Sequence, residues 1–315
     1  MSDKSIPKIT VLIPLFNKRA YVGDSLRSVA RQSFSDFEIV VVDDGSTDDG
    51  ASVVMSLGIP QLRVVTQPNA GVSAARNRGL AESRSSLVAF LDADDVWQRD
   101  HLHHLWQLHA AFPDACLMAN SFLEVRNNVQ DRIDSQAITY RRVGDFIEEA
   151  ASGRAWIFTS AAMVRRDTCL AIGGFRIGES RGEDVDLWIR MALSYPVAMS
   201  SYIGTFYRRV AGSLTSSHQV SQPDVAMRTI TSALEDKCVS DTRRQNLDEL
   251  YSRMALAHAA DSLLQRQPSV ARRFIREAAR SKMYANRRRA LSLLTFLPRT
   301  LVTILFKLRS LINAR

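Results

Sequence analysis

The chain has 315 residues, 46% of them hydrophobic, with 14 Gly and 9 Pro, which excludes a disordered or fibrous protein and predicts one main globular domain with an extension. Three widely separated cysteines without metal-ligand spacing exclude a disulfide framework and predict reduced thiols in a cytosolic protein. The net charge is +8, but residues 266–315 carry thirteen Lys or Arg and one acid, or +12, which leaves −4 for residues 1–265 and predicts an anionic partner for the tail.

The first hundred residues alternate between short β-branched runs and helical patterns. The first eight residues are polar and the apolar run after them is too short for a signal peptide, so the chain is expected to open on a strand. Ser46 is expected to cap the second helix. Strands alternating with helices predict a parallel sheet. We expect strands at 8–13, 37–42, 62–66 and 87–91, and helices at 21–32, 46–57 and 71–83.

The rest of the chain predicts more sheet and then helices only. After a helix at 100–112 come strand-like runs at 116–125 and 157–164, a turn at Gly173-Gly174, and a helix that starts with acids at Gly182-Glu183-Asp184. From 223 to 285 the pattern is helical, with an αα-hairpin around Gln267-Pro268 and an Ala-rich interface. We therefore predict three parts: a mixed, mostly parallel α/β domain over 1–217, a helical extension over 218–286, and a basic amphipathic segment over 287–315.

Three aspartates, Asp92, Asp94 and Asp95, lie within four residues just after an expected buried strand. Their carboxylates repel one another unless a cation lies among them, so the triplet indicates a divalent metal site. Taken alone, it is better explained as a solvated turn at a helix start, because acids favour helix N-termini. Polar clusters also follow the first two strands, and ligands of parallel sheets gather at this edge. The turn after strand one has no glycine and no Walker A sequence occurs, so a phosphate-bearing ligand would need a metal and side chains.

Six motifs occur in an order and spacing that resemble the family 2 inverting glycosyltransferases of the GT-A fold, over residues 6–215. Each motif alone is weak, because Asp-Asp-Gly-Ser is also a common turn. They are Ile13-Pro14-Leu15-Phe16-Asn17, Val42-Asp43-Asp44-Gly45-Ser46-Thr47-Asp48, Asn69-Ala70-Gly71 with Ala75-Arg76-Asn77-Arg78-Gly79, Leu91-Asp92-Ala93-Asp94-Asp95, Gly173-Gly174-Phe175, and Gly182-Glu183-Asp184 with Leu187-Trp188.

The resemblance implies a nucleoside-diphosphate sugar donor, with a UDP- or dTDP-sugar favoured. Phe16 matches the aromatic that stacks on the base, and Asp44 the acceptor of a pyrimidine imide hydrogen. Asp94 matches the direct ligand of Mg²⁺ or Mn²⁺, and Asp95 a second ligand or a carboxylate that orients its neighbours. The donor-binding residues implied are Pro14, Phe16, Asn17, Asp44, Arg76, Asn77, the ribose-contacting Asp92, and Arg208.

The resemblance also implies the chemistry of an inverting transfer. Asp184 matches the base that activates an acceptor hydroxyl, and the adjacent Glu183 is expected to raise its proton affinity. One departure stands out. Many relatives read Tyr-Arg-x-His after the last strand, whereas this chain reads Tyr207-Arg208-Arg209-Val210. Arg208, Arg209 or His218 is expected to take the place of that histidine near the phosphates.

Some tryptophan and histidine residues could be mistaken for sugar-binding or metal-binding residues. Trp97 and Trp188 are predicted to pack rather than to form sugar platforms. The histidines of the 100–112 helix point to different sides, apart from the neighbours His101 and His104, so a solvated surface is predicted rather than a zinc site.

The last 29 residues predict a helix that lies in a membrane interface. Leucines and isoleucines fall on one helical face, and Pro298 with Arg299 interrupts the run too early for a transmembrane span. A helix packed on its own protein or on a second subunit is the alternative. The expected protein is a cytoplasmic glycosyltransferase, peripheral on the inner membrane face, with a glycan or lipid-linked acceptor and no nucleic acid. A nucleotidyltransferase making nucleotide sugars, or a non-enzymatic basic nucleic-acid binder, is the rival interpretation.

Overall fold

The computed structural model describes residues 6–125, 137–179, 181–209, 222–297 and 301. The chain divides into two compact units. One contains Met1–Gly144 with Ile157–Ser216, and the other contains Asp145–Trp156 with Ser217–Arg315. The predicted domain limits at 217 and 286 stay predictions, and the grouping of 145–156 with the C-terminal helices has no counterpart in the sequence patterns.

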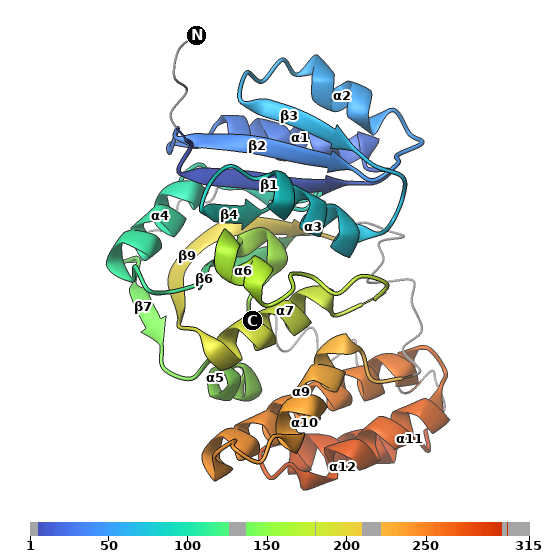
Figure 1. Cartoon of the computed structure of the whole chain (residues 1–315). Coiled ribbons are helices and arrows are strands. Elements are labelled where there is room, and N and C mark those ends of the chain that lie inside the picture. The colour runs from blue at the N-terminus through green and yellow to red at the C-terminus, as the bar shows by residue number, and fades with distance from the viewer. Residues whose placement is uncertain (1–5, 126–136, 180, 210–221, 298–300, 302–315) are drawn as a thin grey trace. The chain divides into compact units, whose positions relative to one another are not determined.

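In the part of the first unit that the structure describes, nine strands form one mixed sheet (Figure 1). Its order is β3-β2-β1-β4-β8-β6-β9-β5, with β7 paired to β9. The first four strands run parallel, and antiparallel β8 joins them to the rest. The strands are β1 (Ile9–Leu15), β2 (Phe37–Asp43), β3 (Leu62–Thr66), β4 (Leu87–Phe90), β5 (Val96–Trp97), β6 (Leu117–Val125), β7 (Tyr140–Val143), β8 (Ala162–Arg165) and β9 (Val197–Arg208).

Helices flank this sheet, as predicted. All residues of β1 and β2 are buried, because both faces of these strands are covered. Alternate β1 residues pack with α1 and α4, whereas Val40 and Val42 pack with Ala75 of α3. Each fully buried aliphatic side chain contributes about 1.5–3 kcal/mol. The helices are α1 (Arg19–Ala30), α2 (Gly50–Ser56), α3 (Val72–Glu82), α4 (His101–Ala111), α6 (Arg166–Ala171) and α7 (Glu183–Ser194), with a 3-10 turn η1 (Thr159–Ala161).

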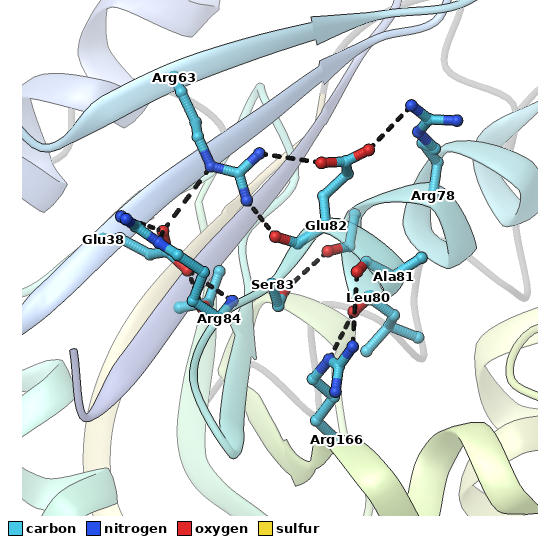
Figure 2. A network of polar contacts seen from close by, with 11 residues as sticks. Glu38, Arg63, Arg78, Leu80, Ala81, Glu82, Ser83, Arg84 and Arg166 are labelled. Atoms are coloured by element: carbon cyan, nitrogen blue, oxygen red, sulfur yellow. Dashed lines mark hydrogen bonds and ion pairs between the residues drawn. The ribbon is translucent and has the colours of Figure 1, made fainter. Parts of the chain in front are cut away.

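Buried Glu38 on β2 is the centre of a polar network at the start of the parallel strands (Figure 2). It accepts hydrogen bonds from the Thr10 hydroxyl at 2.8 Å and from Arg84 Nε at 2.7 Å. Burial alone would raise the pKa of Glu38, but the hydrogen bonds from Arg84 and Thr10 hold it below its ordinary value. Arg63 of β3 lies 3.7 Å from the same carboxylate and 3.2 Å from Glu82 of α3. The network therefore joins β1, β2, β3 and α3.

The last carbonyls of α3 are satisfied by arginines rather than by a glycine cap. Arg166 Nε donates to the Leu80 carbonyl at 2.8 Å, and Arg63 donates to the Glu82 carbonyl (Figure 2). Cations here also complement the helix dipole. These contacts anchor α3, the helix that carries Arg76 and Asn77 into the candidate site.

In its described residues the second unit consists of helices: α5 (Phe146–Ser152), α9 (Val225–Glu235), α10 (Asp241–Leu264), α11 (Pro268–Glu277) and α12 (Ala285–Leu294), with the 3-10 turn η2 (Ala278–Arg280). The helices after residue 223 are as predicted, whereas α5 has no counterpart in the sequence patterns. The αα-hairpin is confirmed between α10 and α11, where Arg266 adopts a left-handed φ of 64°. Of the predicted Ala-rich interface, Ala255, Ala259 and Ala271 are fully buried, whereas Ala257 is exposed. Within the described residues, no helix is both long and apolar enough to cross a bilayer.

Three local predictions are wrong. The second helix begins at Gly50, not Ser46, because the Ser46 N–H donates to the Asp43 side chain at 3.0 Å and the following turn is not helical. The 157–164 run enters its strand through the turn η1. His101 is not on the surface. It is buried and stacks on Trp97 with ring centroids 4.3 Å apart, and burial lowers the pKa of His101 to about 3.

Candidate active site

Two loops at the carboxyl ends of β1 and β2 are joined by Asn17. Its φ of 52° is left-handed, which asparagine tolerates. The side-chain oxygen Oδ1 of Asn17 accepts from the Thr47 N–H at 2.8 Å, and the Asn17 backbone N–H donates to Ser46 Oγ at 3.2 Å. The predicted donor-binding residue Pro14 lies buried in β1, and Phe16 follows the strand with 45% of its surface exposed. Asn17 therefore fixes the loop that presents the Phe16 ring.

Asp44 is buried and holds the loop before α3. One carboxylate oxygen accepts from Gln67 Nε2 at 2.8 Å and from the Ala70 N–H at 2.9 Å, and the other accepts from the Gly71 N–H at 2.8 Å. Gly71 has a φ of 89°, which favours glycine. The observed contacts of Asp44 are thus structural, and its contact with a nucleotide base stays a prediction.

Arg76 on α3 is a buried cation between two carboxylates. It lies 2.8 Å from Asp92 after β4 and 2.8 Å from Glu183 at the start of α7. Burial alone would lower the pKa of Arg76, but Asp92, Glu183 and Asp184 raise it above its ordinary value. Arg76 therefore couples the aspartate triplet to α7, and its guanidinium contacts these carboxylates here, so the predicted contact of Arg76 with the donor stays a prediction.

The aspartate triplet lies in the turn between β4 and β5, not at a helix start. Asp94 pairs with Lys18, the residue before α1, at 2.5 Å. Asp95 is buried, and its two oxygens accept from Ser160 Oγ at 2.5 Å and from the Arg208 N–H at 3.0 Å. Burial and the charges of Asp92 and Asp94 raise the pKa of Asp95 well above its ordinary value. These contacts suit Asp95 for bracing the turn, and its ligation of a metal stays a prediction.

Two hydroxyls on η1 were missed by sequence reasoning. Thr159 Oγ1 donates to Asp184 Oδ2 at 2.5 Å. Ser160 Oγ donates to Asp95 and accepts from the Asp92 N–H at 3.0 Å. The neighbouring Ser160 carbonyl accepts from Trp97 Nε1 at 2.6 Å. The only signal in the sequence is a Thr-Ser pair inside an apolar run.

The candidate base Asp184 lies in the first turn of α7, where the helix dipole favours acids. Its second oxygen accepts from the Val185 N–H at 2.7 Å, so both hydrogen bonds to this carboxylate come from neutral donors. Glu183 instead pairs with Arg76. Burial and the Asp184 charge raise the pKa of Glu183, although Arg76 counteracts them. The two acids thus differ in their partners: Asp184 accepts hydrogen bonds from neutral groups, whereas Glu183 is held in an ion pair with Arg76.

Asn77 positions the loop between α6 and α7. Its amide nitrogen donates to the Phe175 carbonyl at 2.7 Å, and its amide oxygen accepts from the Phe175 N–H at 2.9 Å. A Cβ at Gly174 would lie 2.5 Å from the same oxygen, and the φ of 60° there also favours glycine. Asn77 therefore acts on the protein backbone in this structure, and a donor contact by it stays a prediction.

Arg208 at the end of β9 extends toward α1. Its guanidinium lies 3.4 Å from Asp24 and 5.5 Å from the Tyr21 ring centroid. Arg209 pairs with Glu124 at 2.7 Å. His218, the other candidate replacement for the missing histidine, lies outside the described residues. Trp97 and Trp188 are both buried, which confirms their predicted packing role.

The residues of this site suit a hard divalent cation. Carboxylate oxygens are the donors that Mg²⁺ prefers, and burial together with the charges of Asp92 and Asp94 raises the pKa of Asp95. Within the described residues, no three metal-binding side chains lie close enough together to hold an ion.

Comparison with known proteins decides the family. The sequence profile of glycosyl transferase family 2 matches residues 10–169, about half of the chain. The chain belongs to glycosyl transferase family 2. The matched region runs from β1 to α6 and contains every predicted donor and metal residue except Arg208. Glu183 and Asp184 also lie beyond it.

Curated relatives of family 2 share about a third of the aligned residues. An uncharacterized glycosyltransferase of Nostoc is 32% identical over 167 residues, which are 51% of each chain. The succinoglycan biosynthesis protein ExoW of Rhizobium meliloti is 38% identical over 119 residues, 36% of this chain and 37% of its own. The match thus spans about half of the Nostoc protein and less of ExoW.

Solved structures show the same fold over nearly the whole chain. Staphylococcus aureus TarS (residues 1–349) in complex with UDP-GlcNAc aligns with a TM-score of 0.71 and 19% identity, covering 95% of this chain and 92% of that one. The mannosyltransferase PcManGT of Pyrobaculum calidifontis, in complex with GDP-Man and Mn²⁺, aligns with a TM-score of 0.60 and 19% identity, covering 95% and 84%. The fold predicted from the motifs is confirmed.

Proposed function

We infer that this protein transfers a sugar from a nucleoside-diphosphate sugar to an acceptor hydroxyl with inversion at the anomeric carbon. The observation that carries this proposal is the convergence of Asp92, Asp94, Glu183 and Asp184 around Arg76 and Lys18, in a chain of glycosyl transferase family 2. Fold neighbours in complex with UDP-GlcNAc and with GDP-Man support a nucleotide-sugar donor.

Asp184 is the proposed base. The acceptor O–H attacks the anomeric carbon, its proton moves to Asp184, and the bond to the diphosphate breaks with both electrons leaving on the nucleotide. The neutral donors Thr159 and Val185 orient the carboxylate without neutralising it, and each of its oxygens keeps a further lone pair. Glu183 is less suited, because Arg76 holds its carboxylate in an ion pair.

Asp94, with Asp95 as the second predicted ligand, would hold Mg²⁺ or Mn²⁺, which supplies charge neutralisation at the departing diphosphate. Phe16, which is 45% exposed, is the proposed stacking partner of the nucleotide base. Arg76 keeps Asp92 and Glu183 in place through the buried ion pairs. The contribution of the chain itself is therefore orientation and proton transfer.

The proposed acceptor is a growing surface glycan or a lipid-linked sugar. The similarity to a succinoglycan biosynthesis protein favours an extracellular polysaccharide. The UDP- or dTDP-sugar expected from Asp44 is retained as part of this proposal.

We also propose that the basic end of the helical unit binds the cytoplasmic face of the membrane. Around α12, Leu293 and Phe296 are 69% and 74% exposed, and Lys282 and Arg289 are exposed as well. Exposed apolar side chains beside cations suit an anionic lipid surface. Of the predicted segment 287–315, residues 298–300 and 302–315 lie outside the described residues.

Co-sedimentation with vesicles tests the membrane proposal. The wild type is expected to bind vesicles that contain phosphatidylglycerol, to release at high salt, and to bind less after Leu293→Ser with Phe296→Ser. Met55→Ser is the matched control, because Met55 is 65% exposed on α2. Equal binding to neutral and anionic vesicles, or none to either, would contradict the proposal.

A thermal-shift screen tests the catalytic proposal. UDP-, GDP-, dTDP- and CMP-sugars are each added with Mn²⁺ or EDTA. One nucleotide family should stabilise the wild type, only with metal, and Asp94→Ala should lose that response. Asp167→Ala, at a surface aspartate, is the control. Hydrolysis of the responding donor then tests Asp184→Asn, which should bind normally but turn over about 10²–10⁴-fold more slowly. The anomer of the product reports inversion, and full activity of Asp184→Asn would reject the assigned base.

A further inference from the structure

Two basic side chains pair with the aspartate triplet, and the ion pair of Lys18 with Asp94 is shorter than that of Arg76 with Asp92. Lys18 Nζ lies 2.5 Å from Asp94 Oδ2, and the two side chains are 26% and 16% exposed. Asp94 is the carboxylate of the triplet to which the direct metal contact is assigned. An ammonium group therefore occupies one oxygen of the proposed metal ligand.

The backbone of Lys18 is held firmly. It is the residue before α1, and its carbonyl accepts from the N–H groups of Tyr21 and Val22, both at 2.9 Å. On its other side, Asn17 is fixed by the β2 loop. Only the side chain of Lys18 is free to move, and it carries a point charge on a flexible four-carbon stem.

Lys18 and a divalent cation cannot share Asp94 without strong repulsion, because two positive charges would lie within a few ångströms. Entry of the cation requires the ammonium to leave. A diphosphate arriving at this edge of the sheet would offer the ammonium new anionic oxygens within reach of the same fixed backbone.

We propose that Lys18 is an internal counter-ion of Asp94 that competes with the divalent cation and moves to the donor diphosphate when the donor binds. The cation and the nucleotide then bind cooperatively, and each raises the affinity of the other by the same factor. The metal site is weak without a donor and is completed by it. This inference rests on the proposed metal-dependent function.

Removing the ammonium should change the two affinities in opposite directions. Lys18→Met keeps the length of the stem but not the charge. Without nucleotide, it is expected to bind Mn²⁺ about 10-fold more tightly than the wild type, within the usual range of such couplings. It is expected to bind UDP or GDP more weakly, and to lose most of the cooperativity between metal and nucleotide.

The experiment measures free Mn²⁺ by electron paramagnetic resonance in titrations of the purified full chain, alone and with UDP or GDP. Lys8→Met is the matched control, since Lys8 is 51% exposed and pairs with Asp36 at 3.8 Å. Adding Asp94→Asn to Lys18→Met should abolish the tightened binding, which locates the ion at Asp94. Melting temperatures verify that each variant is folded.

The outcomes separate this inference from the function on which it rests. If the wild type binds Mn²⁺ and Lys18→Met binds it equally or more weakly, the competition is refuted and metal dependence stands. If neither the wild type nor any variant binds Mn²⁺ with either nucleotide, the metal-dependent function is refuted, and the proposed role of Lys18 is refuted as well.

Discussion

Thr159 Oγ1 donates a hydrogen bond of 2.5 Å to Asp184 Oδ2, so a side chain on the turn before β8 holds the proposed base on α7. The next residue, Ser160, holds Asp95 in the same way. The short turn η1 thus holds both the proposed base Asp184 and the proposed metal ligand Asp95. Loss of a group that orients a functional side chain typically costs about 10- to 100-fold in affinity or activity.

Thr159→Val should therefore slow turnover with little effect on donor binding. The valine keeps the shape of threonine but cannot donate, so Asp184 loses its orientation. We expect kcat to fall about 10- to 100-fold while the KM for the donor stays within about twofold. Steady-state kinetics with the donor found in the thermal-shift screen measure both values.

Thr159→Ser is the control for this prediction, because it restores the hydroxyl without the methyl group. It should recover most of the lost kcat. If the serine variant is as slow as the valine variant, the threonine acts through packing and the hydrogen bond has no catalytic role.

Arg76→Met should destabilise the protein strongly. It leaves Asp92 and Glu183 without their shared cation, and breaking a buried pair costs about 3–5 kcal/mol. We expect the lower end of that range, because Asp92 remains 27% exposed. Urea unfolding gives the free energy of unfolding directly.

Arg78→Met is the matched comparison on the same helix. Arg78 is 53% exposed and pairs with Glu82 at the surface, where such pairs contribute about 0–1 kcal/mol. Similar losses in the two variants would show that Arg76 is not the electrostatic centre of the site.

Much of the site could be predicted because it depends on residues that are close together in the sequence. The strand ends that carry Asn17, Asp44 and the triplet follow from β-branched runs and the parallel-sheet rule. The hairpin at Pro268 follows from proline at a helix start.

Long-range partners were not predictable in the same way. The sequence predicts Ser46 as a helix cap, but the Ser46 N–H donates to the Asp43 side chain and the helix begins at Gly50. Lys18 and Thr159 have no special local pattern, and they meet Asp94 and Asp184 across 76 and 25 residues of sequence. The sequence predicts a solvated surface for His101, whereas the structure buries this side chain against Trp97.

Glu38 should make stability depend on pH. Its pKa in the folded state lies below the ordinary value of 4.5, so its charge stabilises the fold above that pH, and this contribution is lost as pH falls through the lowered pKa. Glu38→Gln should be less stable than the wild type at neutral pH, with a gap that narrows below about pH 4.5. Urea unfolding across pH measures the gap. A gap that widens on acidification would contradict the assignment.

Gly79→Ala should destabilise α3 against β1, although alanine is the better helix former. A Cβ at Gly79 would lie 2.5 Å from Leu12 Cγ and Cδ1, and Leu12 is fully buried. The helix-propensity gain is about 1 kcal/mol, whereas overpacking a core costs about 1–3 kcal/mol, so the clash prevails. Gly144→Ala is the control, because nothing lies within 4 Å of a Cβ there. A higher free energy of unfolding for Gly79→Ala than for the wild type would mean that β1 and α3 separate more easily than their packing implies.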